Sequence, residues 1–137
     1  MNFDYNSEEF EKTLMYNEFS NENGGEGILK IQASAASRAI PLKNVSIVVS
    51  KIIDGNKIVF FTGLTDESGI IESIILPAQK SFGEINSSKD IVYTTYDVSA
   101  KYLDYDKKFN VSIFDGIKVI QPVRIPINDL IEGGLNE

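Results

Sequence analysis

The chain of 137 residues is 42% hydrophobic and 24% charged, with a net charge of −7, as expected for one folded domain with its own core. It contains no histidine and no cysteine, which excludes a Ser-His-Asp triad, thiolate catalysis, disulfides and zinc bound by sulfur. These absences predict that the protein is not an enzyme and that it holds no metal and no other cofactor.

The negative charge is concentrated near the N-terminus. Residues 1–26 hold seven acidic residues and only Lys12, giving −6, whereas the other 13 acids and 12 bases give −1. The chain shows no basic surface pattern, so we expect no nucleic-acid partner. It also shows no apolar run of roughly 20 residues and no secretory signal at its first residues, so we expect cytoplasmic synthesis and no membrane partner.

The acidic N-terminal segment also carries large apolar side chains. Phe10 and Leu14 lie four residues apart, and Asn6 with Glu9 resembles a capping box, which together predict a short helix over about residues 7–17. A purely solvated tail has no need of these side chains. We therefore predict an arm that docks on a neighbouring molecule, with a mobile acidic tail as the alternative. The docking side chains would be Phe10, Leu14, Tyr16 and Phe19.

From Gly27 onward the hydrophobic pattern has a period of two, as in half-buried strands. Asp54-Gly55-Asn56 is typical of a hairpin turn. Seven or so short strands without a long amphipathic helix predict an all-β fold, an antiparallel β-sandwich of about seven strands with an N-terminal arm. The expected domains are the arm over residues 1–26, the sandwich over residues 27–127 and a polar tail over residues 128–137.

A polar segment, Thr65-Asp66-Glu67-Ser68-Gly69, separates two runs rich in isoleucine, leucine and phenylalanine. Its short polar side chains can bond nearby backbone N–H groups, and Gly69 can adopt a positive φ. A calcium loop would need more oxygen ligands at alternating positions. We interpret the segment as the corner of a sheet. The longer connection over residues 78–91 is the more suitable place for a binding site.

Two stretches resemble known β-sandwich families. Residues 27–51 and 62–78 resemble the opening of carboxypeptidase-regulatory or transthyretin-like domains, which share the sandwich with CnaB-like and immunoglobulin-like folds. The region over residues 76–126 is similar to an N-terminal domain of spore cortex-lytic and peptidoglycan-binding proteins of anaerobic spore formers. The matching residues are Leu76-Pro77-Ala78, Tyr93, Tyr96-Asp97-Val98, residues 111–116 and Gln121. The resemblance implies a non-catalytic accessory fold.

Two groups of residues could carry covalent or acid–base chemistry. An isopeptide cross-link between a lysine and an asparagine or aspartate would require burial that lowers the lysine pKa. Asp104 and Asp106 flank a turn, where they are expected to stay solvated, so glycoside chemistry is not expected. The cross-link candidates are Lys30 or Lys43, Glu72, and Asn110 or Asp115.

These observations predict a non-enzymatic structural module that associates with copies of itself, or docks on a structural partner protein, through its N-terminal arm. The resemblance places it in a bacterial spore-surface, appendage or phage-tail-like assembly, incorporated into a spore surface or released outside the cell. The alternative is an accessory domain that binds peptidoglycan or another cell-wall glycan through Tyr93 and Tyr96. Their spacing of three predicts that they point to opposite faces of a regular strand, which favours a packing role.

Overall fold

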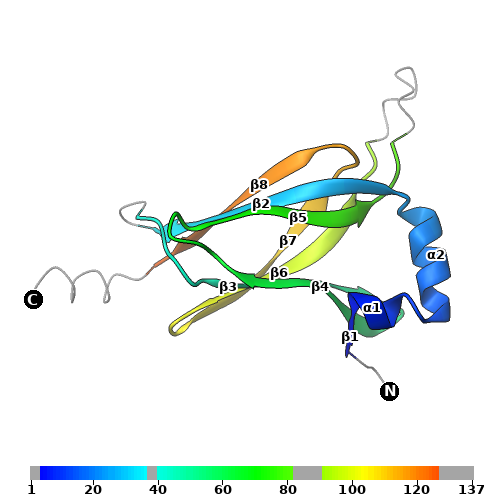
Figure 1. The fold of residues 1–137 in the computed structure, drawn as a ribbon, viewed down its shortest axis with the longest axis horizontal. Helices are drawn as coiled ribbons and strands as arrows, with labels where there is room; N and C mark the ends of the chain where they lie inside the picture. The colour runs from blue at the N-terminus through cyan, green and yellow to red at the C-terminus, as the bar shows by residue number, and fades with distance from the viewer. Residues whose placement is uncertain (1–3, 37–39, 82–90, 127–137) are drawn as a thin grey trace, which may run out of the picture.

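The computed structural model describes residues 4–36, 40–81 and 91–126. Two β-sheets lie face to face, with two short helices at one end (Figure 1). The first sheet contains, in order, β1 (Asp4–Asn6), β4 (Asn56–Leu64), β3 (Ser46–Ile53), β6 (Thr94–Tyr102) and β7 (Tyr105–Ile113). The second contains β5 (Ile70–Ala78), β2 (Gly25–Ala35) and β8 (Lys118–Ile125). The helices are α1 (Ser7–Phe10) and α2 (Leu14–Glu22).

The fold is an all-β sandwich, as the sequence predicts. The predicted polar tail over residues 128–137 lies outside the described residues, and so does most of the connection over residues 78–91. In the part of the chain that the structure describes, no helix is long and apolar enough to cross a membrane.

Two strand pairings differ from the expected antiparallel arrangement. β2 is parallel to β8 and β1 is parallel to β4, whereas the other paired strands are antiparallel. The chain passes from the first sheet to the second in the short turn between β7 and β8, which brings β8 beside β2. The period of two locates a strand and its buried face, but it does not specify which neighbour the strand pairs with.

The main core lies between the two sheets and is built from alternate residues of the strands. Leu29 and Ile31 of β2 and Ile47 and Val49 of β3 are fully buried. Each such side chain contributes roughly 1.5–3 kcal/mol by leaving water. This burial holds the two sheets together and fixes which side chains remain on the outer faces.

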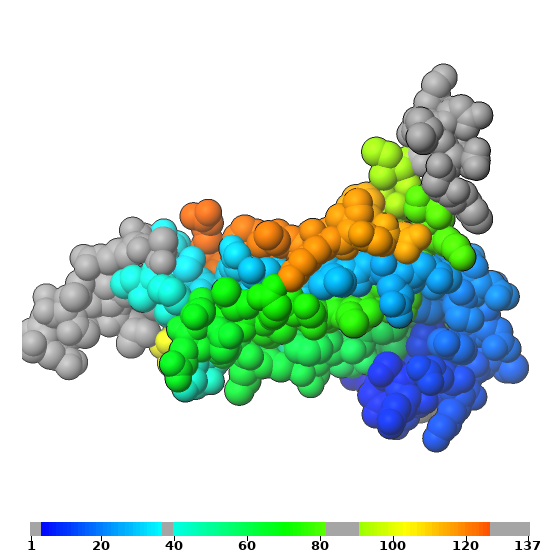
Figure 2. Space-filling model, turned by 45° about the horizontal axis from the view of Figure 1, so that its top comes forward, coloured from blue at the N-terminus to red at the C-terminus, as the bar shows by residue number. Residues whose placement is uncertain are grey.

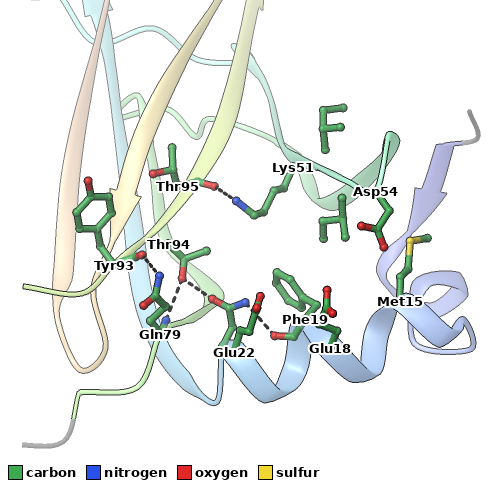
Figure 3. Close-up of a pocket in the computed structure, with 13 residues that line it drawn as sticks. Met15, Glu18, Phe19, Glu22, Lys51, Asp54, Gln79, Tyr93, Thr94 and Thr95 are labelled. Atoms are coloured by element: carbon green, nitrogen blue, oxygen red, sulfur yellow. Dashed lines mark hydrogen bonds between the residues drawn. The ribbon is translucent and has the colours of Figure 1, made fainter.

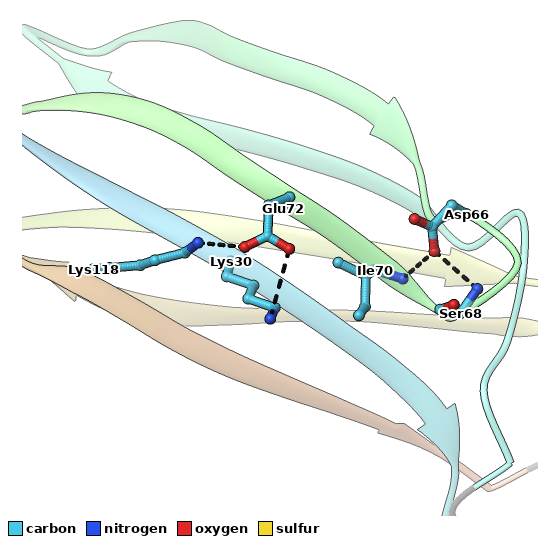
Figure 4. A network of polar contacts seen from close by, with 6 residues as sticks. All are labelled: Lys30, Asp66, Ser68, Ile70, Glu72 and Lys118. Carbon is cyan, nitrogen blue, oxygen red and sulfur yellow. Dashed lines mark hydrogen bonds and ion pairs between the residues drawn. The ribbon is translucent and has the colours of Figure 1, made fainter.

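The polar segment over residues 65–69 forms the corner between β4 and β5 (Figure 4). One carboxylate oxygen of Asp66 accepts the backbone N–H groups of Ser68 and Ile70, both at 2.9 Å. Gly69 has a φ of +77°, a conformation that disfavours any side chain. The interpretation of this segment as a sheet corner is confirmed.

The N-terminal segment packs on its own sandwich. β1 adds a strand to the edge of β4, and Asn6 and Glu9 form the predicted capping box at the start of α1. The single helix predicted over residues 7–17 is wrong, because the chain turns after Phe10 and the Thr13 hydroxyl donates to the Phe10 carbonyl at 2.8 Å. α2 then begins and extends beyond the predicted end.

Two of the four predicted docking side chains are buried within this chain. Phe10 and Phe19 pack with Ile58 of β4 in a second hydrophobic cluster, and their ring centroids are 5.3 Å apart in an edge contact. Phe60 packs against both this cluster and the main core. The prediction that Phe10 and Phe19 dock on a neighbour is therefore corrected, because β4 of the same chain already covers them.

Candidate functional site

A cavity of about 660 Å³ lies at one end of the sandwich, between α2 and the ends of β3 and β6 (Figure 3). α2 contributes Met15, Glu18, Phe19 and Glu22, which share one face of the helix because they recur every three or four residues. Residues 51–54 of the β3–β4 hairpin and residues 93–95 at the start of β6 form other parts of the wall. The volume is in the range of ordinary small-molecule sites, roughly 300–1,000 Å³.

A network of hydrogen bonds fixes the end of α2 against β6. The Thr94 hydroxyl donates to the side-chain oxygen of Asn23, and Asn23 donates its amide to the Phe19 carbonyl at 2.8 Å. The backbone N–H of Gln79 donates to the Thr94 hydroxyl at 2.9 Å, and its side-chain amide donates to the Tyr93 carbonyl at 2.8 Å. These polar groups are satisfied by one another, so they shape the wall of the cavity.

Lys51 brings a positive charge into this cavity. Its ammonium donates to the Thr95 carbonyl at 2.8 Å and lies 5.7 Å from the centre of the Tyr96 ring. Burial lowers the pKa of Lys51, and the nearby Asp97 carboxylate opposes that change. An ammonium has three N–H donors, and among the described residues only the Thr95 carbonyl bonds to this one. The side chain therefore keeps donor capacity for a ligand.

The charged lining as a whole is acidic. Glu18 and Glu22 of α2 and Asp54 of the hairpin are exposed side chains around the cavity, and Lys51 is its cation. Three negative charges and one positive charge give −2. Sequence reasoning missed this site, because the residues come from separate segments that only the packing of α2 on the sandwich brings together.

Of the predicted docking side chains, Leu14 is the one that the structure presents to solvent, with 88% of its surface exposed. Tyr16 is partly buried, and its ring makes an edge contact with Phe10 at 5.4 Å. The four side chains therefore do not form a common exposed face. The apolar ones that can reach β4 are buried on it, and Leu14 at the start of α2 points away.

The two predicted glycan-stacking tyrosines lie in different surroundings. Tyr96 is 1% exposed, its hydroxyl donates to the Pro77 carbonyl, and burial raises its pKa. Tyr96 therefore cannot stack on a sugar in this fold, which corrects that prediction. Tyr93 is 45% exposed, lies against the Phe114 ring and forms part of the cavity wall.

The candidate isopeptide residues are engaged elsewhere. Lys30 of β2 forms an ion pair with Glu72 of β5 at 3.6 Å, and Glu72 also bonds to Lys118 of β8 (Figure 4). Asn110 is exposed on the other sheet. Asp115 accepts the backbone N–H groups of Ser81 and Glu26, which lowers its pKa. Lys43 pairs with the exposed Glu67.

The outer face of the three-stranded sheet is a second surface that the sequence did not reveal. Ile28 of β2 is directly opposite Ile75 of β5, which is 61% exposed, and Ile120 of β8 is 52% exposed beside Lys30. The sequence feature that could have indicated this surface is the occurrence of isoleucines on both faces of these strands. We call this surface the isoleucine face, and its members are Ile28, Lys30, Glu72, Ile75, Lys118, Ile120 and Arg124.

No family model and no curated protein matches this sequence. Among solved structures, the fold is similar to 5-hydroxyisourate hydrolase from Klebsiella pneumoniae, with 13% sequence identity and a TM-score of 0.44. That similarity covers 70% of this chain and 90% of the other.

This comparison corrects one expectation. The lack of histidine and cysteine predicted that the protein is not an enzyme, but the similar structure is that of a hydrolase. The absence of histidine and cysteine removes particular catalytic groups and does not by itself exclude catalysis. The reaction named for the Klebsiella protein belongs to that protein.

Proposed function

We propose that this protein is an assembly module whose copies associate head to tail, with the N-terminal helices of one copy against the isoleucine face of the next. The observation that carries the proposal is the separation of charge. Residues 1–26 hold seven acids and one base, whereas the isoleucine face holds three bases and one acid. Two surfaces of opposite charge on one chain favour contact between copies.

The proposed acidic partner surface is built from exposed side chains of the N-terminal helices and the turn between them. Glu8 of α1, Glu11 in the turn and Leu14 of α2 are all exposed, and Leu14 is the most exposed large hydrophobic side chain of the described residues. We call these three residues the acidic surface. A leucine of this kind can be buried in a contact while the flanking carboxylates select a basic partner.

The isoleucine face provides the matching chemistry. Ile75 and Ile120 offer apolar area, and Lys30, Lys118 and Arg124 against Glu72 give a local charge of +2. In Figure 2, β5, β2 and β8 lie side by side on one face, and the N-terminal segment lies at one end of the molecule. The contact is expected to join unlike surfaces, which builds a ring or an open filament.

Charge reversal on each surface tests the proposal. Glu8→Lys/Glu11→Lys and Lys118→Glu/Arg124→Glu are each expected to give monomers in light scattering coupled to size-exclusion chromatography, because each reverses one surface. An equimolar mixture is expected to restore association, because the two reversed surfaces attract each other. The matched control is Lys107→Glu/Lys108→Glu, two exposed residues of β7, which should assemble as the unmodified protein does. A monomeric unmodified protein, or a mixture that stays monomeric, contradicts the proposal.

The cellular setting is part of the proposal. The sequence resemblance suggests a spore surface, an appendage or a phage-tail-like assembly. Immunogold labelling of sporulating cells of the source organism is expected to mark one of these structures. Label confined to the cytosol of such cells would contradict this setting while leaving the association of copies to be judged by the charge-reversal experiment.

A further inference from the structure

The cavity beside α2 places unlike charges on different walls. Figure 3 shows Lys51 extending from β3, and Glu18 and Glu22 on the helix. Asp54 lies on the hairpin side of the same cavity. Phe19 and Met15 also line the cavity and supply apolar surface. This arrangement suits a ligand with charges of both signs at the ends of an aliphatic body.

The charged groups of the cavity are available, in contrast to its neutral polar groups. Within the described residues, no ion pair joins Glu18, Glu22 or Asp54 to a base. Lys51 is bonded to one backbone carbonyl. The neutral groups of Asn23, Thr94 and Gln79 are bonded to each other or to the backbone, so recognition would depend on the charges.

We propose that this cavity binds a basic α-amino acid such as lysine, whose carboxylate lies at Lys51 and whose side-chain ε-ammonium lies among Glu18, Glu22 and Asp54. The cavity offers three carboxylates and one ammonium, and lysine offers two ammonium groups and one carboxylate, so the charges are complementary. The aliphatic part of the ligand lies along Phe19 and Met15. The acidic surface and the isoleucine face contribute no residue to this cavity, so the inference goes beyond the proposed assembly.

Burial gives the carboxylate end of the ligand a specific role. The pKa of Lys51 is lowered because its ammonium has lost part of its hydration. A ligand carboxylate would replace that hydration with a charge-assisted hydrogen bond. This bond makes the site selective for an intact carboxylate, and binding is expected to raise the pKa of Lys51.

Three probes of nearly the same size test which ligand charges matter. L-lysine is the reference, lysinamide lacks the carboxylate, and norleucine lacks the ε-ammonium. In calorimetric titrations, both analogues are expected to bind about fivefold or more weakly than L-lysine, the scale of one partly exposed ion pair. No binding of L-lysine at millimolar concentration, or equal binding of norleucine, would overturn the inference.

Substitutions of the charged cavity residues test which residue binds each charged group of the ligand. Lys51→Gln is expected to abolish the preference for L-lysine over lysinamide and to keep the preference over norleucine. Glu18→Gln/Glu22→Gln is expected to weaken the preference over norleucine and to keep the preference over lysinamide. If a variant binds all three probes more weakly without these specific changes in preference, the cavity is distorted and the assignment is overturned.

Two control chains distinguish L-lysine binding in the cavity from effects of misfolding and of assembly. Lys107→Gln, an exposed lysine of β7, is expected to bind L-lysine as the unmodified chain does. The titrations are repeated in the Lys118→Glu/Arg124→Glu chain, which leaves the cavity intact and carries the reversed isoleucine face. L-lysine binding that persists there supports the cavity independently of assembly, and binding that disappears there contradicts the cavity assignment.

Discussion

At the corner between β4 and β5, one glycine has both an unusual conformation and a close neighbour. Gly69 has a φ of +77°, and a Cβ atom placed on it would lie 2.3 Å from the carbonyl oxygen of Ala33. Gly116 has nearly the same conformation, with φ of +75°, but no atom within 4 Å of the corresponding position. Substitutions at these two glycines therefore separate the energetic cost of the positive φ from the cost of the close contact with Ala33.

We therefore predict that Gly116→Ala lowers the free energy of unfolding by roughly 1–2 kcal/mol, the cost of the left-handed conformation alone. Gly69→Ala is expected to lose about 1–3 kcal/mol more, because β2 or the corner must move to accommodate the methyl group. Urea denaturation of both variants measures the difference. Equal losses would show that the Ala33 contact relaxes without cost.

Tyr96 leads to a prediction about pH. Its buried hydroxyl donates to the Pro77 carbonyl, and its pKa is raised above the ordinary value of 10.0 because burial disfavours the phenolate. The unfolded chain loses this proton from about pH 10 upward while the folded chain keeps it. Stability is therefore fully present below pH 10 and falls as the pH rises above that value.

Tyr96→Phe is expected to lose about 1–2 kcal/mol at neutral pH, because the Pro77 carbonyl loses its partner. The variant should also lose less stability than the unmodified protein between neutral and strongly alkaline pH. Denaturation curves across this range provide the measurement. Tyr93→Phe, which alters a half-exposed ring outside β6, is the control and should retain the alkaline loss. Parallel pH curves for the unmodified protein and Tyr96→Phe would contradict the assignment.

At the level of elements, the N-terminal helices and the sandwich have separate hydrophobic clusters. Phe10, Phe19 and Ile58 form the smaller one, and Phe60 connects it to the main core. The helices should therefore be able to detach while the two sheets stay paired. Segments that open independently in this way are common in folded proteins.

Phe19→Ala is expected to remove roughly 3–5 kcal/mol of packing from the smaller cluster. Hydrogen exchange should then become fast in α1, α2 and the paired residues of β1, while β3 and β6 remain protected. Leu14→Ala, also in α2 but at an exposed position, is the matched control and should leave the exchange pattern unchanged. Uniform loss of protection across both sheets would contradict the separation of the two clusters.

The same elements show what the sequence could and could not predict. The alternating pattern of residues 28–33 and the Asn6–Glu9 capping box depend on local spacing, and both are found in the structure. Whether Phe10 and Phe19 pack on their own β4 or on a neighbour depends on tertiary structure, which the spacing does not contain. The cavity was not predictable for the same reason, since α2 meets β3 and β6 only after folding.

For the whole molecule, the important property is that the two proposed contact surfaces differ. If an identical patch met itself, association would stop at a dimer. A contact between the acidic surface and the isoleucine face leaves one free surface of each kind, so growth continues unless a ring closes. The charged part of this contact is also expected to weaken with salt, because the screening length falls from about 10 Å at 0.1 M to about 3 Å at 1 M.

A chain with one defective surface should therefore stop growth. Lys118→Glu/Arg124→Glu retains Glu8, Glu11 and Leu14, so it can add to the isoleucine face at the end of an assembly and then offers no such face itself. Adding it below equimolar amounts to unmodified protein is expected to shorten assemblies in sedimentation velocity, in proportion to the fraction added. The chain that also carries Glu8→Lys/Glu11→Lys matches only other copies of itself, so as the control it should not shorten the assemblies of unmodified protein. Assemblies of unchanged length with the first variant would mean that copies meet through another surface.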